Sequence, residues 1–68
     1  MINLELDIYE LGLQNKTMYA LNNNGIYTIK QLVALSHEDL IKIPGIGPNT
    51  KADIMICLKK HELHLGIR

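Results

Sequence analysis

The part of the sequence best suited to chemistry is residues 43–50, Ile-Pro-Gly-Ile-Gly-Pro-Asn-Thr, in which two glycines flank one isoleucine. Glycine adopts backbone angles closed to other residues and lets a ligand come close to the main chain. Pro48 stands where a helix should begin, because proline is favoured in a first turn, where its missing N–H would have no partner. A helix N-terminus beside a glycine turn offers free amides, so the pattern predicts a site for an anion such as phosphate. The alternative is a helix connector without a ligand.

Two other groups of residues have the right types for chemistry but the wrong arrangement. His61 and His64, with Cys57 nearby in the sequence, have a metal-like spacing, but no second cysteine or carboxylate cluster completes a tetrahedral set. Residues 36–39, Ser-His-Glu-Asp, contain hydrolase residue types, but consecutive residues at a helix start do not face one another as a catalytic triad must. We therefore expect no metal, no cofactor and no enzyme activity. Cys57 is expected to be a buried, inert thiol.

Apolar spacing predicts that short helices position the glycine segment. Asparagine and glycine at residues 22–25 can supply the left-handed residue that closes a helix. Thr28 with Gln31, and Ser36 with Asp39, match the start of a helix, where a hydroxyl group caps the first turn. The predicted helices cover residues 16–24, a segment that follows Thr28, a short segment between Ser36 and Pro44, and residues 48–61.

The two ends of the sequence have a different pattern from the helices. In residues 1–13 the first four apolar side chains alternate with polar ones, which is the period of an extended strand. No later segment is an obvious partner strand. Residues 1–13 are therefore predicted to form an extended arm that packs on the helices, with room for one helical turn at residues 7–11. Leu63, Leu65 and Ile67 also alternate and are predicted to fold back against the core.

Composition narrows the class of protein. Sixty-eight residues make at most one domain, and 47% apolar residues allow a core filled mostly by leucine and isoleucine. The aromatic residues are Tyr9, Tyr19 and Tyr27, of which Tyr19 and Tyr27 are expected to complete the core with their hydroxyls in water. The single cysteine allows no internal disulfide. No segment has the pattern of a signal peptide or a membrane span, so a soluble, intracellular protein is expected.

The charges of the protein balance overall but not locally. Seven basic and seven acidic residues give a formal net charge of zero, so no overall field attracts the protein to nucleic acid. Glu5, Asp7 and Glu10 have no basic partner in the first fifteen residues, whereas basic residues outnumber acidic ones near the C-terminus. Binding to a polyanion must therefore come from a local site.

Residues 40–47, Leu-Ile-Lys-Ile-Pro-Gly-Ile-Gly, resemble the helix-hairpin-helix motif of DNA-binding proteins. A longer series resembles the C-terminal domain of the bacterial RNA polymerase α subunit over about residues 7–68; it consists of residues 8–17, Leu21, 25–29, Leu32, 35–47 and 63–66. This resemblance implies an all-α fold, a compact bundle of four to five short helices in a single domain of residues 1–68. The implied parts are an extended N-terminal arm at residues 1–13 and a helix-hairpin-helix motif at residues 39–60.

The same resemblance implies binding to the minor groove and phosphates of A·T-rich promoter DNA. It also implies contacts with RNA polymerase, σ or activators, in a cytoplasmic, nucleoid-associated bacterial protein. Lys16 falls on the family's groove-binding arginine, Tyr19 on an asparagine and Asn49 on a lysine, and each departure should weaken DNA binding. Asp53 falls on the acid that steadies the arginine. The implied DNA-binding residues are Lys16, Tyr19, Gly45, Ile46, Gly47, Asn49, Thr50 and Asp53.

Three interpretations stay open at this point. The first is a transcription-associated DNA-binding domain. The second is a free-standing look-alike of the polymerase domain that acts mainly by protein contact with σ or activators, with weak or no DNA binding. The neutral net charge and the departures at Tyr19 and Asn49 favour it, and the acidic residues 5–10 offer a surface for a basic partner. The third is a domain excised from a longer subunit.

Overall fold

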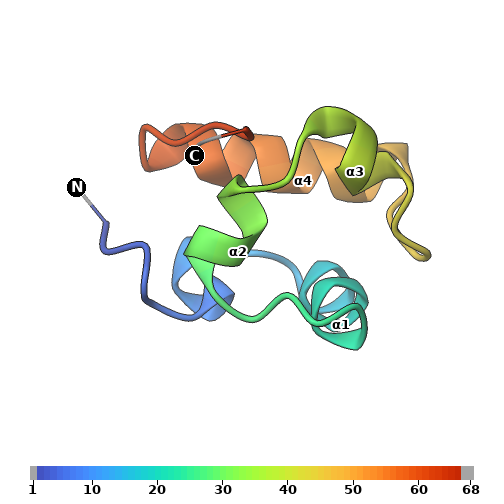
Figure 1. The fold of residues 1–68 in the computed structure, drawn as a ribbon, viewed down its shortest axis with the longest axis horizontal. Helices are drawn as coiled ribbons and strands as arrows, with labels where there is room; N and C mark the ends of the chain where they lie inside the picture. The colour runs from blue at the N-terminus through green and yellow to red at the C-terminus, as the bar shows by residue number, and fades with distance from the viewer. Residues whose placement is uncertain (1, 67–68) are drawn as a thin grey trace.

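The computed structural model describes residues 2–66, and within them a 3-10 turn and four α-helices form a small bundle (Figure 1). The bounds are η1 (Ile8–Leu11), α1 (Asn15–Asn23), α2 (Ile29–Val33), α3 (His37–Ile41) and α4 (Pro48–Lys60). The predicted all-α fold is confirmed. The first and last predicted helices, 16–24 and 48–61, agree with α1 and α4 to one residue at either end. No helix in residues 2–66 is long and apolar enough to cross a lipid bilayer.

The core lies between α4 on one side and η1 and α1 on the other, with α2 between them (Figure 1). Its members are aliphatic apart from one cysteine, and each is at most 7% exposed. They are Ile8, Leu11, Leu13, Leu21, Ile26, Ile29, Leu32, Val33, Leu40, Ile54, Cys57, Leu58 and Leu65. Helix α4 extends along the bundle (Figure 1), and it packs on α1 and contributes Ile54, Cys57 and Leu58 to the core.

The expectation that Tyr19 and Tyr27 complete the core is wrong. Tyr9, Tyr19 and Tyr27 are 69%, 67% and 53% exposed. Helix α1 buries Thr17 and Leu21 instead, which lie four residues apart on one face of the helix. Tyr19 is two residues from each of them, so its side chain emerges on the opposite side of α1.

Two of the helices are only five residues long and depend on their caps. The Thr28 hydroxyl accepts a hydrogen bond from the Gln31 amide at 3.2 Å, and the Gln31 side chain accepts from the Thr28 amide at 3.0 Å. Ser36 and Asp39 form the same reciprocal pair at the start of α3, at 3.0 and 3.3 Å. Helices this short are marginal by themselves. Each capping box satisfies first-turn amides that would otherwise lack acceptors, as the sequence predicts.

The N-terminal arm pairs with the start of α2. The amides of Ile29 and Lys30 donate to the carbonyl oxygens of Leu6 and Leu4, at 2.9 and 2.8 Å. The Ile8 amide donates in return to the Tyr27 carbonyl at 2.9 Å. These bonds supply acceptors for the first amides of α2, which have no partner inside the helix. The arm is therefore a structural part of the bundle, and it then turns into η1.

At the C-terminus, α4 closes with a residue in the left-handed region. Glu62 has a φ of +59°. The amide of Leu63, which follows it, bonds back to the Leu58 carbonyl at 2.8 Å. Leu65 is buried and Leu63 is partly buried against the core, as predicted, whereas Ile67 lies outside the described residues. The Gly66 amide donates to the Leu35 carbonyl at 2.8 Å and fixes the tail to the connection between α2 and α3.

Replacing Glu62 by glycine is expected to raise the free energy of unfolding by about 0.5–1 kcal/mol. The left-handed conformation strains a glutamate but not a glycine, and glycine's larger entropy loss on folding offsets part of the gain. Thermal unfolding followed by far-UV circular dichroism measures the change. Glu62→Ala is the control, since it removes the charge but keeps a Cβ. If Glu62→Ala raises the Tm as much as Glu62→Gly does, the effect comes from loss of the charge, and the prediction is contradicted.

Candidate nucleic-acid interface

The glycine segment forms a hairpin between α3 and α4. Helix α3 ends at Ile41, three residues before Pro44. Gly45 has a φ of +91°, in the region that favours glycine, and the Ile46 amide donates to the Ile43 carbonyl at 3.1 Å. Ile46 is half-buried and packs against the core. The turn is thus held by its own backbone bond and by one apolar side chain.

The hairpin lies directly on α1. A Cβ atom added to Gly45 would stand 3.2 Å from the Cβ of Ala20, which is closer than ordinary van der Waals contact. Figure 1 shows the hairpin and α1 at the same end of the molecule. A Cβ added to Gly47 would meet no atom within 4 Å. Glycine is therefore favoured at position 45 by the positive φ and by the close approach of α1, whereas a Cβ at position 47 would meet open space.

The start of α4 presents amides without acceptors. Gly47 is the N-cap, in an extended conformation and with no side chain to cap the helix, and Pro48 is the first helical residue. The first bond into the helix runs from the Lys51 amide to the Gly47 carbonyl at 2.9 Å. The amides of Asn49 and Thr50 precede it and have no acceptor inside the helix. Gly47 and Asn49 are exposed, so an anion can reach this turn.

Thr50 is more enclosed than its neighbours in the hairpin. It is 7% exposed, and it lies on the inner side of α4 with Ile54 and Leu58. Its side chain therefore helps to join α4 to the core. Of the two residues in the first turn with free amides, Asn49 is the one that faces solvent.

Helix α1 carries the two other residues on which the expected groove contact depends. Lys16 and Tyr19 are both exposed, and at a spacing of three residues they are neighbours on the helix surface. Lys16 forms no ion pair within residues 2–66. Its ammonium group is therefore available to an external anion.

Asp53 connects the two helices. Its Oδ2 atom accepts hydrogen bonds from the Thr17 hydroxyl at 2.8 Å and from the Gln14 amide at 3.1 Å. The resemblance implies an acid that steadies the residue at position 16. In the structure the carboxylate of Asp53 accepts from Gln14, two residues before Lys16, and from Thr17, the residue after it.

Cys57 lies one helical turn after Asp53 on α4. Its sulfur is 3.8 Å from the Gly12 carbonyl oxygen and 3.8 Å from Asp53 Oδ1. Burial and then the neighbouring Asp53 charge raise the pKa of the Cys57 thiol, which outweighs the opposite effect of Lys60. A thiol that is buried and protonated is a poor nucleophile and a poor metal ligand. Within residues 2–66 no group of three or more histidine, cysteine or acidic side chains could hold a metal ion.

Two shallow hollows flank the paired helices. One, of about 350 Å³, is at the hairpin and is lined by Ile41, Ile46, Gly47, Pro48 and Lys51. The other, of about 490 Å³, is on the outer side of α1 and η1 and is lined by Asp7, Tyr9, Asn15, Met18, Tyr19 and Asn22. Lys51 in the first hollow is a cation beside the free amides of α4 that the sequence argument did not select.

The expected residues lie on α1, on the hairpin that packs against α1, and on the first half of α4. Lys16, Tyr19, Gly45, Gly47 and Asn49 are exposed, Ile46 and Asp53 are half-buried, and Thr50 is buried. Sequence reasoning missed Thr17 and Ala20, which make the contacts between α1 and the helix-hairpin-helix motif. No neighbouring residues in the sequence mark Thr17 or Ala20 as important. Their roles depend on Asp53 and Gly45, which are distant in sequence.

Comparison with known proteins agrees with the resemblance noted in the sequence. The family model that describes the C-terminal domain of the bacterial RNA polymerase alpha chain matches residues 1–64. DNA-directed RNA polymerase subunit alpha of Thermus thermophilus is 39% identical over 57 residues, which make up 84% of this chain and 18% of that protein. The same subunit of Spirogyra maxima is 40% identical over 50 residues, 74% of this chain and 14% of that protein.

A third relative extends the similarity to almost the whole chain. The alpha subunit of Desulforamulus reducens is 31% identical over 65 residues, 96% of this chain and 20% of that protein. The chain spans about a fifth of the length of the curated relatives it matches. The small helical bundle, the hairpin between α3 and α4, and these matches agree: the chain belongs to the family formed by the C-terminal domains of bacterial RNA polymerase α subunits.

Proposed function

We propose that this domain takes part in transcription by binding A·T-rich DNA, with α1 at the minor groove and the hairpin on the phosphates. The observation that carries the proposal is the packing of the hairpin, which leads into the start of α4, against α1 through Gly45 and Ala20. It puts free amides next to the helix that bears Lys16. Amides at a helix N-terminus bind phosphate oxygens, and a cation is attracted into the narrow minor groove of A-tracts.

The number of cations at this end is small. Asn49 provides no charge; Lys51 lines the hollow at the hairpin, and Lys16 is on α1, the helix on which the hairpin packs. Lysine lacks the planar fork with which arginine bonds two acceptors at once. We therefore propose weak binding with a shallow salt dependence, because the slope of log K against log [salt] grows with the number of phosphates that the protein neutralises.

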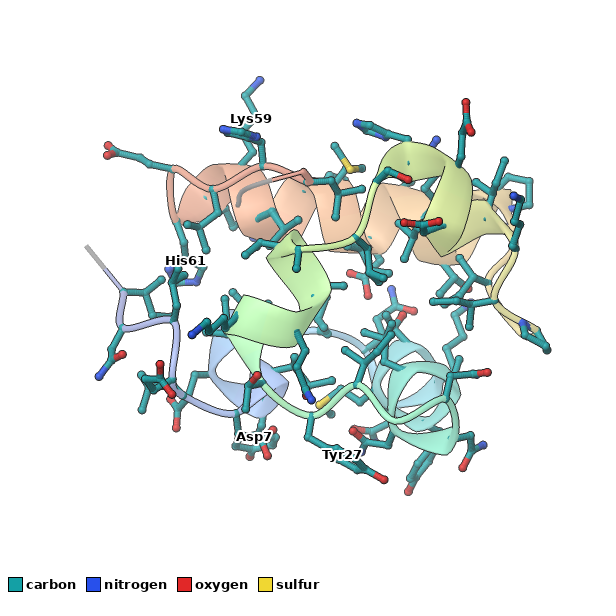
Figure 2. The ribbon with its side chains drawn as sticks, in the orientation of Figure 1. Asp7, Tyr27, Lys59 and His61 are labelled. Atoms are coloured by element: carbon teal, nitrogen blue, oxygen red, sulfur yellow. The ribbon has the colours of Figure 1, made fainter. Side chains whose placement is uncertain are left out.

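A salt series with an A·T-rich duplex tests the proposal. Replacing Lys16 by alanine is expected to reduce affinity for this duplex about tenfold at low salt. The slope of log K against log [salt] should become less steep by the contribution of about one phosphate contact. Lys59→Ala is the control. Lys59 is exposed in the last turn of α4, and Figure 2 shows it projecting from the outer side of that helix. Lys59→Ala therefore removes the same charge as Lys16→Ala, but at a position about 16 Å along the α4 axis from Pro48 and the free amides.

Two results would contradict the DNA-binding proposal. One is the absence of detectable binding at low salt. The other is an equal loss from Lys16→Ala and Lys59→Ala, which would indicate a non-specific attraction to polyanions. A G·C-rich duplex of the same length completes the comparison, since binding through the minor groove distinguishes A·T from G·C pairs. The native protein should bind it more weakly than the A·T-rich duplex.

The hollow on the outer side of α1 favours a second candidate function, contact with another transcription protein such as σ or an activator. Two exposed tyrosines, Tyr9 and Tyr19, line it together with the carboxylate of Asp7. Exposed aromatic faces next to an acid suit a basic side chain. Tyr9→Ala should then weaken binding to purified RNA polymerase holoenzyme, measured by interferometry, whereas Lys16→Ala should not. If Tyr9→Ala has no effect, contact through this hollow is excluded.

A further inference from the structure

Helix α1 ends at an asparagine that is followed by a glycine. Asn24 is the C-cap residue of the helix, and Gly25 follows it with a φ of +81°. No other asparagine in the sequence precedes a glycine. Both residues are exposed, and a Cβ added to Gly25 would meet no atom within 4 Å. Water and hydroxide therefore have access to this turn.

An asparagine in this position can react with the main chain. The Gly25 amide nitrogen, after it loses its proton to hydroxide, can attack the side-chain carbonyl carbon of Asn24, Cγ. A bond forms between that nitrogen and Cγ, the bond from Cγ to Nδ2 breaks, and Nδ2 leaves as ammonia with a proton taken from water. The product is a cyclic imide. Glycine favours the closure, because it has no Cβ to hinder its nitrogen and it rotates readily into the required angles.

Water then opens the imide at one of its carbonyl carbons. Cleavage of the bond between the Gly25 nitrogen and Cγ gives aspartate in an unchanged backbone. Cleavage of the bond between that nitrogen and the main-chain carbonyl carbon of Asn24 gives isoaspartate, in which the chain runs through Cγ. In sum one water is consumed and one ammonia is released, and no oxidant or reductant takes part. Either product replaces a neutral amide by a carboxylate at position 24.

The folded structure holds the reacting groups in an unreactive arrangement. The Gly25 amide donates to the Asn22 carbonyl at 3.1 Å, which retains its proton. The Asn24 Nδ2 atom, which belongs to the leaving group, donates to the Ala20 carbonyl at 2.7 Å. Asn24 has a ψ of +19°, which turns the Gly25 nitrogen toward the Asn24 nitrogen and away from Cβ. Ring closure therefore requires the last turn of α1 to open first.

Little holds this turn closed apart from these hydrogen bonds. The last turn of α1 contains no basic side chain, which would be favoured at the carbonyl end of the helix. Asn23, Asn24 and Gly25 are all exposed, so burial does not hold these residues in place. Helix ends with few buried contacts open at a lower cost in free energy than the whole protein. The turn therefore opens in molecules that are otherwise folded.

We propose that Asn24 is a site of spontaneous covalent modification. When the last turn of α1 opens, the Asn24 side chain cyclises onto the Gly25 nitrogen, and hydrolysis of the imide leaves aspartate or isoaspartate. The reactants are the protein, water and hydroxide. The proposal concerns the free protein and does not depend on the proposed DNA binding.

The modification removes a hydrogen bond that supports α1. A carboxylate has no hydrogen to donate to the Ala20 carbonyl, and a negative charge is disfavoured at the C-terminus of a helix. Ala20 is also the residue whose Cβ faces Gly45 of the hairpin. The modification therefore weakens the turn of α1 on which the hairpin packs.

The first experiment follows the ageing of the native protein in mildly alkaline buffer, with and without guanidinium chloride. The protein is digested, and mass spectrometry with fragmentation assigns the change from amide to acid to Asn22, Asn23 or Asn24. Reversed-phase chromatography separates the aspartate and isoaspartate peptides, which have equal mass. Conversion is expected at Asn24 ahead of the other two, and at least about tenfold faster in denaturant, where the two protecting hydrogen bonds are lost.

Two results of the ageing experiment would overturn the site. One is the absence of conversion at Asn24 in denaturant, and the other is conversion of Asn22 or Asn23 at the same rate. Equal rates at Asn24 with and without denaturant would overturn the requirement that the turn must open.

The second experiment tests the consequence with two variants. Asn24→Asp reproduces one product. Asn23→Asp adds the same charge one residue earlier, at an exposed side chain that makes no hydrogen bond within residues 2–66. The readout is the protection of the Gly25 and Ile26 amides against hydrogen exchange, measured relative to the Leu40 amide of α3.

Protection of the Gly25 and Ile26 amides should fall about fivefold in Asn24→Asp, the effect of losing one cap, and stay within about twofold of native in Asn23→Asp. Equal losses in the two variants would show that the charge alone acts. That result, or unchanged protection in Asn24→Asp, would overturn the role of the Asn24 hydrogen bond.

Discussion

Replacing Ile54 by alanine is expected to remove about half of the free energy of unfolding of this domain. Ile54 is fully buried at the middle of α4, and truncation of a buried isoleucine costs about 2–5 kcal/mol. A protein of this length has a total stability of about 3–10 kcal/mol. One cavity therefore removes a large part of this stability, because Ile54 lies in the hydrophobic core of the domain.

Chemical denaturation followed by far-UV circular dichroism measures this loss. Ile56→Ala is a matched control in the same helix, since Ile56 is 57% exposed. Its truncation should change the free energy of unfolding by less than about 0.5 kcal/mol. If the two variants unfold at the same denaturant concentration, the assignment of the inner face of α4 is wrong.

Gly45→Ala is expected to lower the free energy of unfolding by about 2–3 kcal/mol. An alanine at a φ of +91° is strained by about 1–2 kcal/mol. Its methyl group would also stand 3.2 Å from the Cβ of Ala20, an atom fixed to the backbone of α1 that cannot rotate away. Accommodation of the methyl group requires the hairpin and α1 to move apart by a few tenths of an ångström, at the contact on which the proposed interface depends.

Gly47→Ala is the matched control for the hairpin. Gly47 has an extended backbone and open space around its Cα, so alanine should leave the stability within about 0.5 kcal/mol. A double-mutant cycle with Ala20→Gly isolates the contact from the backbone strain. Ala20→Gly should recover part of the loss in Gly45→Ala, beyond its own cost as a helix substitution of about 1 kcal/mol. Additive losses would show that the strain at φ alone decides the effect.

The elements that the sequence predicts well are those specified by neighbouring residues. The capping boxes at Thr28 and Ser36 and the helix start at Pro48 each depend on residues within four positions of one another. Their geometry follows from backbone chemistry that is the same in any protein. For the same reason the hairpin could be located from its glycines and prolines before the bundle was known.

The contacts that complete the candidate site depend on the tertiary fold. The bond between Asp53 and Thr17 and the approach of Gly45 to Ala20 exist only after α1 and α4 meet. The hydrophobicity of Tyr19 predicted that it would be buried on the inner face of α1. The structure buries the polar Thr17 there, and the Thr17 hydroxyl donates to the Asp53 carboxylate on α4. A periodicity argument cannot anticipate a buried polar side group whose partner is remote in the sequence.

The exposure of all three tyrosines has a consequence for spectroscopy. The sequence has no tryptophan or phenylalanine, so Tyr9, Tyr19 and Tyr27 are its aromatic chromophores. Near-UV dichroism arises from aromatic rings held in an asymmetric, packed environment, and its loss with retained far-UV signal is commonly taken to indicate a molten globule. This domain should show a weak near-UV spectrum while its core is fully packed. Its folding is better judged from the dispersion of the methyl resonances of its buried leucines and isoleucines.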